Sequence, residues 1–160
     1  MRAAVLTVSD RVSRGAAEDT SGDALAELLA ADGLEVVERR VVPDEPDQIA
    51  GAIAELAERA NVVLTTGGTG VTLRDVTPEA TLTVVDRLVP GIAEAIRADS
   101  IAKTPHALLS RGVAGTRGRT LVVNLPGSPG GCRDGYAVLR EALPHALKLL
   151  EGEHTQHRQT

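Results

Sequence analysis

Short apolar runs and helix-period segments alternate along the chain, which is the pattern of an α/β layer fold. Apolar stretches at 3–8 and 62–64 predict buried strands, and 34–42 predicts another strand between them. The segment 49–60 between the last two repeats its apolar residues at helical spacing, and it predicts an amphipathic helix. Thr77 followed by Pro78 predicts the cap of a further helix that runs to about Leu88.

The second half of the chain adds a pattern of another kind. Segments 107–114 and 119–125 predict two strands, and 115–118 (Gly-Thr-Arg-Gly) predicts a hairpin turn that makes the pair antiparallel. Ser128 and Pro129 predict the start of a helix that Pro144 interrupts. The prediction is one three-layer α/β/α domain over residues 1–150, with a mostly parallel mixed sheet containing one antiparallel strand, and a polar tail over 151–160.

Composition excludes several classes of protein. The 160 residues include one Tyr but no Phe or Trp, and the net charge is −5. Stacking platforms for single-stranded nucleic acid need aromatic side chains, and nucleic-acid or anionic membrane surfaces attract basic proteins. Cys132 is the single cysteine, and no apolar run is long enough to span a membrane. We therefore expect a cytoplasmic protein with no nucleic-acid or membrane partner.

The most informative local motif is Thr-Thr-Gly-Gly-Thr-Gly at 65–70, directly after a predicted buried strand. Glycines let a backbone turn its N–H groups toward an anion, and threonine hydroxyls add short donors. The segment is not a P-loop, because no Lys-Ser or Lys-Thr pair follows it. A tight turn would need only one glycine, so phosphate binding by Thr66, Gly67, Gly68, Thr69 and Gly70 is the favoured interpretation.

Two carboxylates are expected near this motif. Asp44 follows the end of a predicted strand, and Asp75 lies five residues after Gly70. Mg²⁺ takes one or two protein carboxylates together with phosphate oxygens, so the pair is suited to that ion. Each aspartate alone is equally typical of helix capping, and only its combination with the glycine motif favours the metal.

Two further polar loops follow predicted strands. Ser9 and Asp10 end the first strand, and Asn124, Gly127 and Ser128 belong to a proline-rigid loop that opens a helix. A helix N-terminus presents free N–H groups to an anion, although an ordinary N-cap explains the second loop in isolation. If the strands before them are parallel, all four polar loops lie at one edge of the sheet.

In order and spacing, these motifs resemble the molybdopterin-binding MogA/MoaB domain of molybdenum cofactor biosynthesis, which is also the G domain of gephyrin and plant Cnx proteins. The resemblance spans nearly the whole chain. It implies a homotrimer, or a hexamer in some MoaB members, and a MoeA-like molybdenum insertase as a partner. The segments that carry it are Thr7–Arg11, Glu18–Gly22, Val42–Glu45, Thr65–Gly70, Arg74–Thr81, Ser110–Gly115 and Asn124–Pro129.

The resemblance implies adenylylation: molybdopterin and MgATP give adenylyl-molybdopterin and pyrophosphate. It gives Asp44 and Asp75 the catalytic role of organising Mg²⁺, and it assigns phosphate binding to the glycine motif. Pterin and nucleotide contacts fall to Ser9, Asp10, Asn124, Gly127 and Ser128. The chain departs from many members at 71–73 and at 130. Two alternatives stay open at this point, a non-catalytic pterin-binding or scaffolding protein and a generic nucleotide hydrolase.

Overall fold

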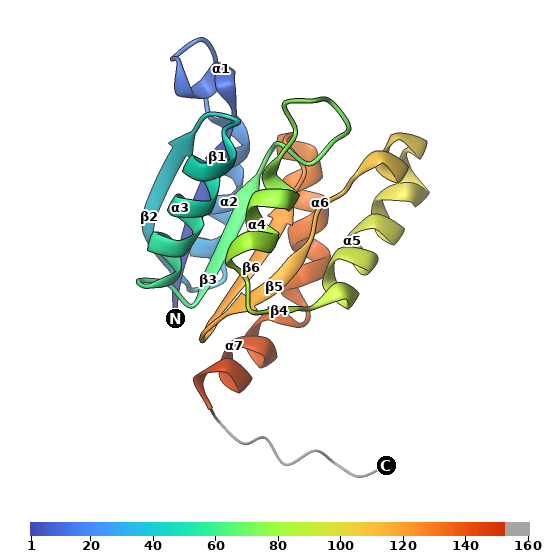
Figure 1. The fold of residues 1–160 in the computed structure, drawn as a ribbon. Helices are drawn as coiled ribbons and strands as arrows, with labels where there is room; N and C mark the ends of the chain where they lie inside the picture. The colour runs from blue at the N-terminus through green and yellow to red at the C-terminus, as the bar shows by residue number, and fades with distance from the viewer. Residues whose placement is uncertain (153–160) are drawn as a thin grey trace.

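A mixed β-sheet runs through the middle of the protein, with helices on both of its faces (Figure 1). The computed structural model describes residues 1–152, and within them the six strands lie in the order β2-β1-β3-β6-β5-β4. The strands are β1 Arg2–Val8, β2 Glu35–Val42, β3 Val62–Thr66, β4 Arg87–Leu88, β5 Ala114–Arg117 and β6 Thr120–Leu125.

Most helices are short, and several begin with a proline in the first turn, where the missing N–H costs nothing. None of them, over residues 1–152, is long and apolar enough to cross a membrane. They are α1 Asp10–Ser13, α2 Thr20–Ala31, α3 Pro46–Ala57, α4 Thr77–Val84, α5 Pro90–Lys103, α6 Pro129–Arg140 and α7 Leu143–Glu151, with a 3₁₀ helix η1 at Pro105–Leu109.

Strand directions confirm the predicted mixed sheet. β2, β1, β3 and β6 pair in parallel, and β5 runs antiparallel to both of its neighbours. The carboxyl ends of the four parallel strands therefore meet at one edge, shown at the top of Figure 1. The four polar loops predicted to share an edge do share it.

Alternate residues of strands β1, β3 and β6 build two separate cores. Val5 and Leu64 face the side covered by α2, α5, α6 and α7, whereas their neighbours Leu6 and Val63 face α3 and α4. The strand period of two puts successive side chains on opposite faces, and both faces are apolar because both are covered. This double burial fixes the strands, and with them the positions of the loops at the carboxyl edge.

The predicted hairpin is present, but its turn lies further along the chain than the sequence indicated. Residues 105–109 form η1 instead of a strand, and Arg117 pairs with Thr120 across a turn at Gly118 and Arg119. Gly118 has φ +55, which suits the first central position of a type II′ turn. Gly115 lies inside β5, where an added Cβ would come 2.6 Å from the Arg87 carbonyl oxygen.

Helix α4 also differs from its prediction. Val76, not Thr77, is its N-cap residue, and the helix ends at Val84 because the chain enters strand β4 instead of continuing to Leu88. The predicted tail begins within α7, whose last residue is Glu151, and residues 153–160 lie outside the described part of the chain.

Candidate active site

The glycine loop, residues 67–70, follows strand β3 at the carboxyl edge of the sheet. Gly67 and Gly68 have φ values of +96 and +68, in the left-handed region that glycine adopts without strain. A Cβ added to Gly67 would come 2.2 Å from the Val8 carbonyl oxygen, and one on Gly68 would come 2.3 Å from Thr77 Oγ1. Both backbone conformation and space therefore require glycine at these two positions.

All the carbonyl groups of the glycine loop are held from behind. The first two accept hydrogen bonds from the Thr77 hydroxyl at 2.9 Å and the Thr77 N–H at 3.1 Å. The last two accept from the Arg111 N–H at 2.9 Å and from Arg111 Nε at 2.7 Å. Two residues distant in sequence thus fix the orientation of four consecutive peptide groups.

This arrangement frees the opposite side of the same peptide groups. The described chain has no cis peptide bond, and in a trans peptide the N–H points away from the carbonyl. The N–H groups of residues 68–71 therefore point away from Thr77 and Arg111, and no acceptor for them is found within residues 1–152. Successive unpartnered N–H groups around glycines form a concave site for an anion.

Asp44 and Asp75 lie against this loop, as the sequence predicted. A Cβ added to Gly68 would come 3.2 Å from Asp44 Oδ1, and one on Gly70 would come 2.9 Å from Asp75 Oδ2. Burial raises the pKa of Asp44 above its usual value, the negative charges of Asp10 and Asp75 raise it further, and the Asp10 N–H opposes them. The two carboxylates are therefore close enough to repel each other beside the glycine loop.

Each of these carboxylates uses one oxygen in the fold. Asp44 Oδ2 accepts the Asp10 N–H at 2.9 Å, and Asp75 Oδ2 accepts the N–H and the hydroxyl of Thr72, both at 2.9 Å. Within the described residues no donor reaches Oδ1 of either side chain. Two carboxylate oxygens beside a phosphate site match the oxygen ligands of Mg²⁺, so the donor set fits that ion.

The carboxylate of Asp10 is occupied by hydrogen bonds within the fold. Its Oδ1 accepts the Asp44 N–H at 3.0 Å, and its carboxylate also receives Nε and Nη2 of Arg74, each at 3.0 Å. The bonds from Arg74 and from the Asp44 N–H hold the pKa of Asp10 below its usual value. Arg74 bonds Glu45 as well, and it thereby ties the segment after the glycine loop to the loops that follow β1 and β2.

Two cavities lie on the two sides of the glycine loop. The carboxylate cavity, of about 360 Å³, contains Asp44 and Asp75 and the predicted residues Ser9, Thr66, Gly67, Gly68 and Gly127. The α5 cavity, of about 340 Å³, contains the predicted residues Thr69, Gly70 and Ser128 together with side chains of α5 and η1. Most of the predicted site residues are thus brought together, on either side of one loop.

Asn124 is in neither cavity. It is buried, its Nδ2 donates to the hydroxyls of Thr65 at 2.9 Å and Thr81 at 3.0 Å, and its Oδ1 accepts the Val113 N–H at 3.2 Å. The sequence suggested a loop residue here, but β6 extends to Leu125 and turns the Asn124 side chain into the fold. In this structure Asn124 joins β3, β6 and α4 through its side chain.

Arg111 was not among the site residues predicted from the sequence, although it contacts the glycine loop. Besides its two bonds to the glycine loop, its Nη2 donates to the Asp75 carbonyl oxygen at 2.7 Å, and Nη1 pairs with Glu79. One guanidinium group therefore positions both the end of the glycine loop and the backbone of Asp75. Its place in the Ser-Arg-Gly segment after η1 was the only available signal.

An anion site made of backbone N–H groups, two adjacent carboxylates and a cavity on each side define a phosphate-binding α/β protein suited to group transfer. Comparison with known proteins makes the class specific. The family model described as "Probable molybdopterin binding domain" matches residues 4–145. The match covers most of the chain, and the chain belongs to this family.

Relatives and solved structures agree over nearly the full length. The molybdopterin adenylyltransferase of Helicobacter pylori is 40% identical over 156 residues, covering 95% of this chain and 89% of the relative. That of Escherichia coli is 37% identical, covering 98% and 88%. The structure of the molybdopterin biosynthesis enzyme MoaB from Thermus thermophilus superposes with a TM-score of 0.89 at 48% identity, covering 97% of this chain and 99% of that one.

Proposed function

We propose that this protein is a molybdopterin adenylyltransferase, which transfers AMP from ATP to the terminal phosphate of molybdopterin and releases pyrophosphate. The observation that carries the proposal is the row of unpartnered N–H groups over residues 68–71, beside two carboxylates that each keep one oxygen free. The names of relatives that share 37–40% identity with the chain support the same activity.

The reaction needs little covalent help from the protein. An oxygen of the molybdopterin phosphate forms a bond to the α-phosphorus of ATP, and the bond from that phosphorus to the bridging oxygen breaks, leaving the electron pair on pyrophosphate. Such transfers depend on in-line positioning and on neutralising negative charge. The N–H groups of the glycine loop donate to phosphate oxygens, and Thr77 and Arg111 keep those groups in place during the transfer.

Asp44 and Asp75 would hold Mg²⁺ through their Oδ1 atoms. When bound, that ion neutralises charge on the polyphosphate. Burial raises the pKa of Asp44, and the nearby negative charges of Asp10 and Asp75 add to the shift; a cation held between the carboxylates would relieve that repulsion. Cys132, the single thiol, is buried with a pKa of about 11, and it is therefore no candidate for a competing covalent route.

The two cavities give two substrates a shared phosphate loop. The carboxylate cavity suits the charged polyphosphate, since the proposed metal ligands line it. The α5 cavity adds apolar contacts from Ile96, Leu109 and Pro126 near the same loop. A molecule in each cavity would bring its phosphate to the glycine loop, which is the geometry that transfer between two phosphates requires.

The test is an assay for adenylyl-molybdopterin with purified protein, molybdopterin and MgATP. We expect product from the unmodified protein and loss of turnover with retained molybdopterin binding in Asp75→Asn. Asp47→Asn, on the exposed start of α3, is the control with the same change of charge. Molybdopterin binding without product would instead identify a non-catalytic binding protein, and rapid ATP hydrolysis without molybdopterin would identify a hydrolase.

We also propose a homotrimer. Exposed apolar side chains occur on α4, β4, α5 and η1, elements that include the β4 edge of the sheet. Apolar surface of this kind is typical of contacts between subunits. The mass in solution, measured by light scattering, tests the trimer against a monomer or a hexamer. The exposed apolar residues proposed for the contact between subunits are Leu82, Leu88, Ile101, Leu108 and Leu109.

We also propose where the protein acts and which protein receives its product. ATP-dependent adenylylation is proposed to occur in the cytoplasm, and the adenylylated product is proposed to pass to a MoeA-like molybdenum insertase. Co-purification of the two proteins from cells, with and without molybdopterin synthesis, would test this transfer. Failure to find the insertase in either condition would contradict a stable complex.

A further inference from the structure

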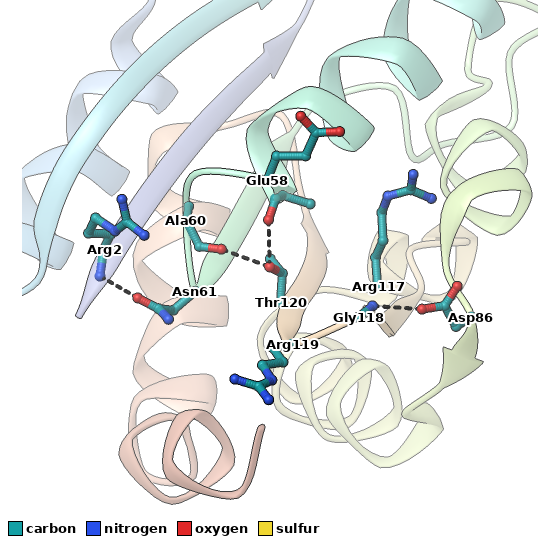
Figure 2. Close-up of a pocket in the computed structure, with 10 residues that line it drawn as sticks. Arg2, Glu58, Ala60, Asn61, Asp86, Arg117, Gly118, Arg119 and Thr120 are labelled. Atoms are coloured by element: carbon teal, nitrogen blue, oxygen red, sulfur yellow. Dashed lines mark hydrogen bonds between the residues drawn. The ribbon is translucent and has the colours of Figure 1, made fainter. Parts of the chain in front are cut away.

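A third cavity lies at the opposite edge of the sheet from the glycine loop, beside the amino ends of β1 and β3 and the β5–β6 turn (Figure 2). Its volume is about 510 Å³, larger than either cavity at the glycine loop. Three arginines from separate positions line it: Arg2 at the start of β1, and Arg117 and Arg119 on either side of the turn glycine. We call it the arginine cavity.

The three arginines of this cavity are not paired with carboxylates in the described part of the chain. Over residues 1–152, Arg2, Arg117 and Arg119 form no ion pair, although the carboxylates of Glu58 and Asp86 line the same cavity. Asp86 instead accepts the Gly118 N–H at 2.6 Å, a bond visible in Figure 2. Elsewhere in this acidic chain, arginines such as Arg39, Arg40 and Arg74 do pair with carboxylates.

The walls of the cavity are held in place by hydrogen bonds that leave donors available. Arg117 Nη1 donates to the Val84 carbonyl oxygen at 2.9 Å, which anchors the guanidinium while its other N–H groups stay free of partners within the described residues. Thr120 bonds the carbonyl oxygens of Ala57 and Ala60 at 2.8 and 2.7 Å, and so joins the end of α3 to β6. Asn61 accepts the Arg2 N–H at 2.8 Å on the facing wall.

These observations define the chemistry of a ligand. The guanidinium fork matches phosphate oxygens and keeps its charge at every physiological pH. No aromatic side chain lines the cavity, so a base or ring gains no stacking there, whereas its volume lies in the usual range for small-molecule sites. We propose that the arginine cavity is a second anion-binding site, which takes a small molecule through its di- or triphosphate group.

This site is separate from the proposed catalytic site, and an experiment can contradict one of the two proposals without affecting the other. The probe is sodium pyrophosphate without magnesium, titrated into the ¹⁵N-labelled full chain while amide resonances are followed. Asn61 reports the arginine cavity, and Gly68 and Gly70 report the glycine loop. We expect the Asn61 resonance to move and saturate, and ATP and inorganic phosphate titrated in the same way distinguish a nucleotide from a free phosphate compound as the source.

The decisive variant is Arg119→Gln, because the Arg119 side chain makes no hydrogen bond within the described residues and its removal should leave folding intact. Charge-assisted hydrogen bonds are strong enough that we expect about tenfold weaker pyrophosphate binding at Asn61, with unchanged binding at the glycine loop. Arg133→Gln, on exposed α6, is the matched control. An Asn61 resonance that does not move, or one whose titration is the same in both variants, would overturn the proposal.

Discussion

At the carboxyl edge of the sheet, the groups proposed to bind an anion are peptide N–H groups, whereas at the amino edge they are the guanidinium groups of Arg2, Arg117 and Arg119. The first site owes its orientation to residues behind it, Thr77 and Arg111, that contact no proposed ligand. The second consists of arginine side chains, exposed at Arg2 and Arg119 and half-buried at Arg117, that would contact the anion directly. The carboxyl edge should therefore be sensitive to substitutions outside the cavity, and the amino edge only to substitutions inside it.

The largest expected effect comes from Arg111→Lys. Lysine keeps the charge but lacks the planar fork whose separate nitrogens bond the carbonyl oxygens of Gly70 and Asp75, so the end of the glycine loop should lose its fixed orientation. A displacement of about 1 Å in such a loop typically lowers turnover about 100-fold. Adenylylation kinetics with a check of the unfolding midpoint measure it.

Two controls sharpen that result. Glu79→Gln removes only the exposed ion pair of Arg111 and should leave turnover within a few-fold, because such pairs contribute about 0–1 kcal/mol. Arg119→Gln, at the other edge, should leave it unchanged. Nearly normal turnover in Arg111→Lys would remove the proposed contrast between the two edges.

Two glycine substitutions are expected to change the free energy of unfolding in opposite directions. Gly67→Ala should destabilise the protein by roughly 1–3 kcal/mol or more, because a left-handed residue gains a Cβ that overlaps the Val8 carbonyl oxygen. Gly51→Ala, in the interior of α3 with open space around it, should stabilise by about 0.5–1 kcal/mol. Urea unfolding measures both, and equal effects would show that the glycine loop adapts.

A difference in pH dependence is expected next. The pKa of Asp44 is raised, so protonation removes its charge as the pH falls through a value above that of an ordinary aspartate, near 3.9. The acid limb of kcat/KM should lie above that value and move to lower pH when Mg²⁺ is increased, since metal and proton compete.

The smallest effect is expected at Cys132, near the glycine loop. The thiol lies at the N-terminal end of α6, where a helix favours the thiolate, but burial raises its pKa to about 11. It should therefore resist iodoacetamide in the folded protein at neutral pH and react fully in urea. Rapid labelling of the folded protein, followed by mass spectrometry, would contradict the burial of this thiol.

The placement of the site could be predicted because its signals are local. Apolar runs identify the strands, and parallel strands bring the loops that follow them to one edge, so Asp44, Asp75 and the glycine loop were expected together and lie together. The sheet with one antiparallel strand was predicted for the same reason.

The roles of Asn124 and Arg111 depended on contacts that no local pattern encodes. Asn124 was expected in a loop, but β6 places it opposite Thr65, whose hydroxyl it bonds. Arg111 lies more than forty residues from Gly70 in sequence, and only the packing of η1 and β5 beside the glycine loop reveals the bond between them. The hairpin turn was misplaced because Gly115 resembles a turn residue, although it serves a close approach of two strands.

Tyr136, the single aromatic residue, has a spectroscopic consequence. It is 1% exposed and donates its hydroxyl hydrogen to Asp32 at 2.8 Å, on the α2–α6 side of the core. With no tryptophan or phenylalanine in the chain, the protein absorbs very weakly in the near ultraviolet. The absorption of a pterin or an adenine can therefore be followed almost without background from the protein, while the emission of Tyr136, in the absence of ligand, reports unfolding.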